Sequence, residues 1–295
     1  MPELPEVETI ARMLTRAVGG RAITEATVLW PGVIDRPAPE AFVRAMTGVR
    51  IERVGRRGKF LVFDLDMPQR LLVHLRMSGR FRVTAAGEIA DVEQAVAVFP
   101  HLRVAMRLDD GRWLLFINQR KFGRFYLVAD IEEVTAPLGP EPLDPAFTAA
   151  RLAERLENRR GEIKRLLLNQ HFVAGIGNIY ASEALWQAKI HPERRADTLT
   201  PAEITRLHRA MVDTLRAGIL DGGTSLEDRQ YVYPDGSLGR HQRSLNVYDR
   251  DAAQCPRCGY AIERIVQGQR STYFCPVCQG DITRSEERQA ERGSA

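Results

Sequence analysis

The sequence predicts an α+β protein, with an N-terminal antiparallel β-sandwich followed by a helical part that ends in a zinc-clamped β-hairpin. Three patterns support this class: strand-like segments between residues 21 and 130, helical periodicity from about residue 147, and four cysteines in two pairs near the C-terminus. At 295 residues the chain is long enough for about two domains, each with its own core.

The composition, 44% hydrophobic and 27% charged, is that of a globular protein. No apolar run approaches the roughly 20 residues of a membrane span, and the N-terminus lacks the basic and apolar regions of a secretion signal. We therefore expect a cytoplasmic protein without a membrane partner. The net charge is only +4, but basic residues gather at 56–59, 120–124, 240–243 and around Arg270. Such clusters suit phosphate contact, although each alone is also typical of a solvated face.

The first six residues read Met-Pro-Glu-Leu-Pro-Glu. A methionine before a small residue is normally removed, which would make Pro2 the N-terminus. A terminal amine has a pKa of about 7.7–8.0 against about 10.4 for lysine, so roughly a tenth of it is unprotonated at neutral pH. Such an amine can attack carbon, and the carboxylates of Glu3 and Glu6 lie close enough in sequence to assist it.

A helix is predicted directly behind these residues. Its apolar positions, which stop at Gly19-Gly20, are Val7, Ile10, Leu14 and Val18. Pro5 fits the first helical position, which places Pro2 and Glu3 just outside the helix N-terminus. The positive end of the helix dipole should lower the pKa of the amine further. The alternative is an ordinary capped amphipathic helix at a chain start.

The sandwich is predicted from segments that alternate apolar and polar residues, with Gly, Asp and Pro between them. These segments are 22–24, 49–51, 59–63, 71–75, 104–107 and 113–117. The four prolines of 137–145 indicate a stiff connection to the helical part.

Two features organise the helical part. Thr200-Pro201-Ala202-Glu203 forms a capping box that opens a helix ending before Gly222-Gly223. Upstream, the glycines of 173–180 interrupt the helical pattern, and Asn178 can cap the helix that follows. A helix N-terminus with exposed amides binds phosphate, but a plain corner between helices uses the same residues.

The cysteines Cys255, Cys258, Cys275 and Cys278 match the spacing of a four-thiolate zinc site. The residues between the pairs, 260–266 and 271–274, read as two strands around 268–270, with Arg270 at the tip. We expect one structural Zn²⁺, because closed four-cysteine sites do no chemistry. Two disulfides are the alternative, disfavoured by the lack of a secretion signal.

Three motifs in this order, Pro2–Glu6, 173–180 and the zinc hairpin with Gln-Arg-Ser-Thr-Tyr-Phe-Cys-Pro at 269–276, resemble the bacterial formamidopyrimidine-DNA glycosylase family. The resemblance runs from Pro2 to about Gln279. It implies a two-layered β-sandwich and a helix–two-turns–helix domain, with DNA in the cleft between them. The implied parts are a catalytic domain at 1–135, a linker at 136–146, a DNA-binding domain with a lesion-capping loop at 147–250, a zinc finger at 251–280 and a disordered tail at 281–295.

The resemblance implies excision of oxidised purines, notably 8-oxoguanine and formamidopyrimidines, followed by cleavage of the strand. Pro2 would attack the sugar C1′ and form a Schiff base, and β- and δ-elimination would follow. Glu3 would protonate the ring oxygen and Glu6 would orient the amine, a role that helix capping explains equally well. Lys59 would contact phosphate near the damaged base.

The implied partner is double-stranded DNA with oxidised bases or abasic sites, bound by a monomer in the bacterial nucleoid. The phosphate contacts would come from His74, Asn178, Tyr248 and Arg270. The damaged nucleotide must leave the helix, which costs a few kcal/mol, and a wedge in the vacated stack offsets part of that cost. The residues implied for this wedge are Met77, Arg120 and Phe122.

The sequence departs from the family at two places. The usual Asp-Pro before the Arg-Lys-Phe-Gly segment is Asn118-Gln119, and the aromatic start of the 239–245 segment is replaced by basic and polar residues. The second departure bears on purine preference. The alternatives are an endonuclease VIII-like enzyme for oxidised pyrimidines, against which Leu4 argues, and a DNA-binding homologue without activity.

Overall fold

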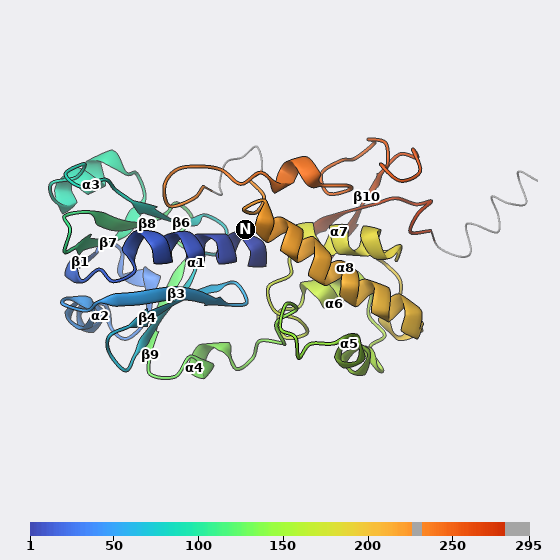
Figure 1. Cartoon of the computed structure of the whole chain (residues 1–295), viewed down its shortest axis with the longest axis horizontal. Helices are drawn as coiled ribbons and strands as arrows, with labels where there is room; N and C mark the ends of the chain where they lie inside the picture. Colours follow the sequence, from blue (N-terminus) through green and yellow to red (C-terminus); the bar gives the residue numbers. More distant parts are fainter. Residues whose placement is uncertain (226–231, 281–295) are drawn as a thin grey trace, which may run out of the picture. The chain divides into compact units, whose positions relative to one another are not determined.

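A computed structural model describes residues 1–225 and 232–280. The chain forms two compact units (Figure 1). The first comprises Met1–Pro137 and Gly218–Gln242, and the second comprises Leu138–Ala217 and Arg243–Ala295. Within the described ranges, no helix is both long and apolar enough to cross a bilayer. The tail predicted to be disordered, residues 281–295, lies outside the described residues.

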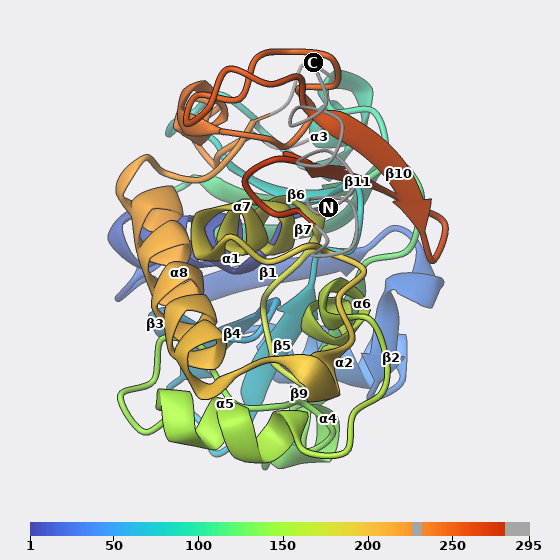
Figure 2. The same ribbon diagram turned by 90° about the vertical axis from the view of Figure 1, so that its right-hand side faces the viewer.

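The first unit contains two β-sheets, which confirms the predicted sandwich. The four-stranded sheet is antiparallel and has the order β1 (Ile23–Val28), β7 (Leu102–Leu108), β8 (Trp113–Asn118), β6 (Gly79–Val83). The five-stranded sheet has the order β2 (Ile34–Arg36), β9 (Arg124–Val128), β5 (Arg70–His74), β4 (Phe60–Leu65), β3 (Ile51–Arg57), and Figure 2 shows several of its strands side by side.

Strands β2, β6 and β9 were not predicted from the sequence pattern. Both β6 and β9 carry arginines, and β9 begins inside the basic cluster 120–124. The three-residue β2 pairs with β9 in parallel, so the second sheet is not purely antiparallel.

Helix α1 (Leu4–Val18) packs on β3 and β4. Its predicted apolar face is fully buried in the sandwich core, together with an aromatic cluster that includes Phe81, Phe116 and Phe125. The helix begins one residue earlier than predicted, with Glu3 as N-cap and Pro5 at the second helical position. Burial of α1 therefore holds the N-terminal residues against the first unit. The shorter helices are α2 (Pro39–Met46), α3 (Val92–Val98) and α4 (Glu132–Thr135).

The second unit is helical and ends in the predicted hairpin. Its helices are α5 (Ala149–Leu156), α6 (Ile163–Leu168), α7 (Asn178–Ala188) and most of α8 (Pro201–Leu220). The capping box before α8 is confirmed, since Thr200 N–H donates to Glu203 Oε2 at 2.8 Å. The N-cap of α7 is Gly177, and Asn178 is its first helical residue, so the predicted capping role of Asn178 is wrong.

The hairpin consists of β10 (Glu263–Gln267) and β11 (Arg270–Phe274). Gly268 and Gln269 form its two-residue turn, and both have positive φ, as a type I′ turn requires. Arg270 therefore starts β11 and pairs with Gln267. The proline-rich segment is attached to the second unit, because Ala174 N–H donates to Pro140 O at 3.0 Å.

Candidate functional site

The N-terminal residues are held by a buried carboxylate. Pro2, Glu3 and Glu6 are all buried, with the two glutamates 4% and 2% exposed. Glu3 N–H donates to Glu6 Oε2 at 2.8 Å, and the Glu3 side chain accepts from Glu6 N–H, so the pair forms a reciprocal capping box. Glu3 thus lies beside Pro2 at the positive end of α1.

Glu6 also binds a segment far away in the sequence. Its Oε1 accepts the N–H of Thr224 at 2.7 Å. Thr224 follows Gly223, whose φ is +83° and where a Cβ would lie 2.8 Å from Glu6 Oε1. Only glycine permits this approach. Glu6 therefore joins the N-terminus to the residues after α8, a link that no pattern in the sequence predicts.

Lys59 lies next to the strand that pairs with the strand of His74. Lys59 is buried in the turn between β3 and β4, and His74 ends β5, where its ring meets Phe60 edge to face at 4.7 Å. His74 Nδ1 accepts the N–H of Arg76 at 3.0 Å, which leaves the proton on Nε2. Burial, together with the charges of Arg76 and Lys59, lowers the pKa of His74 to about 3. His74 is therefore neutral and can offer phosphate a hydrogen bond but no charge.

Met77, Arg120 and Phe122 form one exposed group, here called the wedge cluster. Arg120 Nη1 lies 3.2 Å from Met77 Sδ, and the guanidinium carbon lies 5.2 Å from the centre of the Phe122 ring. Met77 is 41% exposed and Phe122 50% exposed. Arg120 thus contacts both of these exposed apolar side chains, Phe122 through a cation–π contact and Met77 through its sulfur, and neither is packed into a core.

Asn118, the first departure from the family pattern, holds the loop of the wedge cluster. Its side chain is fully buried; Oδ1 accepts the N–H of Gly123 at 3.0 Å, and Nδ2 donates to Ser78 Oγ at 3.1 Å. Ser78 Oγ also accepts the N–H of Arg120. An amide both accepts and donates here, whereas a carboxylate would only accept. The loop is thus fixed at both ends despite the substitution.

In the second unit, Asn178 meets the zinc hairpin. Its Nδ2 donates to Ser271 O at 2.8 Å, and its Oδ1 is buried without a hydrogen-bond partner among the described residues. Ser271 directly follows Arg270, which is exposed. Asn178 and Arg270 are therefore brought to the same end of this unit.

Tyr248 is positioned by Glu183, a residue that sequence reasoning missed. The Glu183 carboxylate, 3% exposed, accepts the N–H groups of Asn246, Val247 and Tyr248 and the side-chain amide of Asn246, all at 2.8–2.9 Å. The Tyr248 ring packs on Tyr273 of the hairpin. The signal in the sequence was a glutamate among the apolar residues of α7. A buried carboxylate is tolerated only when hydrogen-bond donors or a positive charge pair with it.

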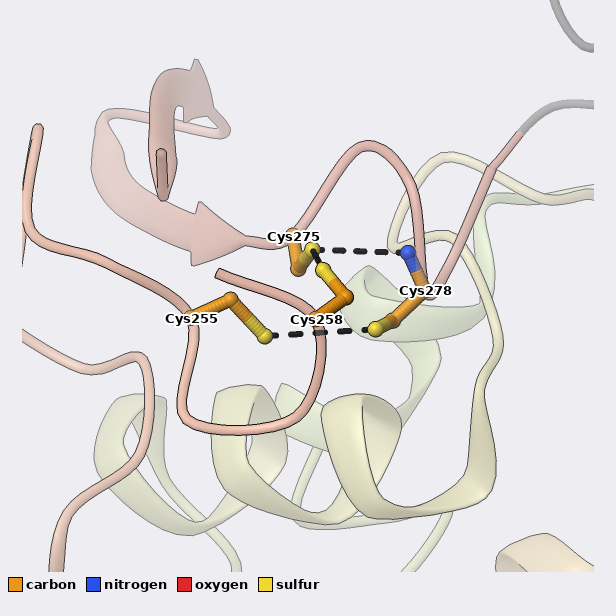
Figure 3. Close-up of side chains that lie close together, drawn as sticks. All are labelled: Cys255, Cys258, Cys275 and Cys278. Atoms are coloured by element: carbon orange, nitrogen blue, oxygen red, sulfur yellow. Dashed lines mark hydrogen bonds between the residues drawn. The ribbon is translucent and has the colours of Figure 1, made fainter. Parts of the chain in front are cut away.

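The four cysteines form a compact cluster (Figure 3). All four Sγ atoms lie within 4.8 Å of one another, with Cys255–Cys278 at 3.9 Å and Cys258–Cys275 at 3.4 Å. Zn–S bonds of about 2.3 Å in a tetrahedron would separate the sulfurs by about 3.8 Å, so the cluster fits zinc. A disulfide would need about 2.05 Å, and all four cysteines are unbridged. The site holds one structural zinc ion.

The ligand Cys255 is prepared for a thiolate by its neighbours. Burial alone would raise its pKa, but the indole N–H of Trp186 and the backbone N–H groups of Arg257 and Cys258 hydrogen-bond the sulfur and lower the pKa to about 6. A thiolate is the form that binds metal.

A β-sandwich that buries an acidic N-terminus, an exposed wedge cluster and a four-thiolate hairpin together define the class of zinc-finger DNA glycosylases. The family model of the formamidopyrimidine-DNA glycosylase N-terminal domain matches residues 1–125. The model of the formamidopyrimidine-DNA glycosylase H2TH domain matches residues 138–230, and that of the zinc finger found in FPG and IleRS matches residues 254–280. The chain belongs to the formamidopyrimidine-DNA glycosylase family.

Individual relatives agree over nearly the whole chain. The formamidopyrimidine-DNA glycosylase of Chloroflexus aurantiacus is 49% identical over 282 residues, 95% of this chain and 98% of the relative. Fpg of Lactococcus lactis, bound to DNA containing an abasic site, is 34% identical with a TM-score of 0.85, covering 95% of this chain and 100% of that one. MutM (Fpg) of Thermus thermophilus is 39% identical with a TM-score of 0.83, covering 95% and 99%. Further structures of the Lactococcus lactis protein contain DNA with N7-benzyl-Fapy-dG or an oxidised pyrimidine.

Proposed function

We propose that this chain is a bifunctional DNA glycosylase and abasic-site lyase of base excision repair, acting on 8-oxoguanine and formamidopyrimidines in double-stranded DNA. The observation that carries the proposal is the buried Pro2-Glu3 pair, bound through Glu6 at the N-terminus of α1. Loss of Met1 turns Pro2 into a secondary amine beside a carboxyl group, which is the chemistry that a covalent glycosylase needs.

In the proposed reaction, the Pro2 nitrogen attacks C1′ as the bond from C1′ to the damaged base breaks. The base leaves with the bonding electrons and takes up the proton that the nitrogen loses. Glu3 protonates the sugar ring oxygen, the ring opens, and C1′ and nitrogen form an iminium ion. Loss of a C2′ proton expels the 3′ phosphate, and a second elimination expels the 5′ phosphate, leaving a one-nucleotide gap. Water then releases the sugar fragment and restores the amine.

The other residues have supporting roles in this proposal. Glu6 fixes Glu3 through its backbone N–H, and Lys59 binds phosphate next to the damaged nucleotide. The wedge cluster fills the vacated stack, with Arg120 hydrogen-bonding the base opposite. Neutral His74 donates a hydrogen bond to phosphate, while Arg270 contributes charge and Asn178 and Tyr248 contribute polar contacts. We assign this activity to a monomer in the cytoplasm of a bacterium, at the nucleoid.

The test is to trap the covalent intermediate with borohydride on duplexes that contain 8-oxoguanine, an oxidised pyrimidine or an abasic site. We expect an adduct on 8-oxoguanine and abasic DNA that maps to the N-terminal peptide. Lys59→Ala is the matched control, since its amine is the other candidate nucleophile, and it should still be trapped on abasic DNA. An adduct that maps to Lys59, or undiminished activity in protein that retains Met1, would overturn the mechanism.

Oxidised pyrimidines are the second candidate substrate. The observation that favours them is the polar segment 239–242, which replaces aromatic residues of the family pattern. Faster single-turnover excision of an oxidised pyrimidine than of 8-oxoguanine would make them the principal substrate.

A further inference from the structure

The residues after α8 are bound to residues 239–242 by two sets of hydrogen bonds within the first unit. In the first set, His241 Nδ1 lies 2.8 Å from Asp221 Oδ2, while the N–H groups of Arg240 and His241 donate to Asp221 O and Gly223 O, both at 3.1 Å. His241 is only 4% exposed. A buried imidazole against a carboxylate is a strong, charge-assisted contact and is costly to break.

The second set joins Ser225 and Gln242. Ser225 N–H donates to Gln242 Oε1 at 3.3 Å, and Gln242 Nε2 donates to Gly239 O at 3.0 Å. Gly239 N–H in turn donates to Ser225 Oγ at 2.9 Å. The side-chain pairs Asp221–His241 and Ser225–Gln242 are here called the polar latch. One of its members, His241, stands where the family pattern has an aromatic residue.

Gly223 and Thr224, which approach Glu6, lie in sequence between two residues of the polar latch, Asp221 and Ser225. Gly223 accepts from His241 N–H, and the next residue, Thr224, donates to Glu6 Oε1 at 2.7 Å. Glu6 Oε2 accepts from Glu3 N–H. A short series of contacts therefore leads from the backbone N–H of His241 through Gly223, Thr224 and Glu6 to Glu3. The bond between the His241 side chain and Asp221 fixes the position of that backbone N–H. A carboxylate can complete this series of contacts because each oxygen accepts one N–H; a glutamine has only one such oxygen.

Base release and abasic-site cleavage place different demands on Glu3. Release of a base needs protonation of the closed sugar ring as the C1′–base bond breaks. An abasic site already equilibrates with an open-chain aldehyde, with which the amine can condense directly. The position of the Glu3 carboxyl group should therefore limit the first reaction much more than the second.

We propose that the polar latch is a positioning device for base excision: it holds Thr224 against Glu6, and Glu6 in turn holds the acid Glu3. His241, Asp221 and Gln242 are positioning residues and touch no reacting atom. This inference rests on the proposed function.

The test compares His241→Phe, which removes the bond to Asp221 but keeps a ring, with His241→Asn, whose Nδ2 can replace Nδ1 as donor. In single-turnover assays we expect His241→Phe to excise 8-oxoguanine about tenfold more slowly, with abasic-site cleavage changed less than about twofold. His241→Asn should recover most of the excision rate. The matched control is Asp235→Asn. The Asp235 carboxylate accepts the backbone N–H and the hydroxyl of Ser237 and is not part of the polar latch, so its loss should leave both rates unchanged.

A double-mutant cycle connects the latch to the acid. If both act through one chain of contacts, Glu6→Gln with His241→Phe should be no slower in excision than Glu6→Gln alone. Additive losses, equal losses of excision and abasic-site cleavage in His241→Phe, or no rescue by His241→Asn would each overturn the proposal.

A separate measurement distinguishes failure of the polar-latch proposal from failure of the proposed function. Amide hydrogen exchange of the free protein should be faster at residues 221–225 in His241→Phe than in His241→Asn. Unchanged exchange would reject the latch. If exchange responds but the wild-type protein neither excises bases nor forms a trapped adduct, the proposed function is wrong and the role in excision falls with it.

Discussion

Each unit of this protein uses a buried glutamate on a helix to hold a distant segment, but the two glutamates differ in how many segments they hold. Glu6 of α1 accepts one N–H from each of two segments, one of them next to Pro2. Glu183 of α7 accepts four N–H groups from a single short segment, 246–248. Glu6 therefore joins two separate segments, whereas Glu183 fixes only one. Substitutions in the first unit should therefore change rates, and those in the second should change stability and affinity.

The largest effect is expected from the zinc site of the second unit. Cys258→Ser opens the tetrahedron, and because metal binding supplies the folding energy of so short a hairpin, residues 255–278 should unfold. Zinc content should fall from one per chain and DNA affinity should fall sharply. Arg270→Ala is the matched variant: it should keep its zinc and lower the salt slope of binding by about one unit. Full zinc occupancy with normal affinity in Cys258→Ser would contradict the structural role.

Glu3→Gln, a substitution in the first unit, should give the next largest effect. Glutamine keeps the size of the side chain but cannot donate a proton as an acid, so excision of 8-oxoguanine should slow by about a hundredfold or more at near-normal duplex affinity. Single-turnover kinetics measure the rate. Glu40→Gln is the control, because Glu40 lies in the first turn of α2 and is exposed. Excision by Glu3→Gln at the wild-type rate would mean that another group is the acid.

Glu183→Gln tests the second half of the comparison. Its single amide oxygen leaves some of the four donors unpaired, which should cost about 2–4 kcal/mol in the free energy of unfolding. Denaturant unfolding measures this loss, and DNA affinity should fall similarly for damaged and undamaged duplexes. The exposed Glu154→Gln should change stability by less than about 0.5 kcal/mol. Normal stability with slow excision in Glu183→Gln would contradict the assignment of Glu183 to stability and Glu6 to the reaction rate.

The smallest expected effect is the change that His74 causes in the free energy of unfolding at acidic pH. Because its pKa in the folded protein is about 3 and that in the unfolded chain is about 6.5, only the unfolded chain binds the proton between these values. Stability therefore falls as pH falls below 6.5, by about 2 kcal/mol between pH 6.5 and 5. His74→Asn, which can still accept from Arg76 N–H, should flatten this part of the unfolding curve by that amount. Parallel curves for the two proteins would contradict the low pKa.

The fold was largely predictable because the relevant signals are local. The helical spacing of α1, the capping box of α8 and the alternation of six strands each lie within one segment. The missed strands β6 and β9 place arginines on their solvent side, which resembles a basic loop in sequence. The zinc ligands were named because side-chain type and spacing reveal them, whereas the residues of the wedge cluster were named from the family resemblance. The partners of Glu6 and Glu183 were not, since a hydrogen bond across 218 or about 64 residues leaves no periodic trace.

The close approach at Gly223 also has an evolutionary consequence. Every other residue would place a Cβ against Glu6 and would have to adopt a backbone angle that favours glycine. Alanine is already the smallest replacement, so every substitution at position 223 meets this contact, and a compensating change would have to move Glu6 itself. Glycine at position 223 and glutamate at position 6 are therefore constrained together, although they lie far apart in the sequence.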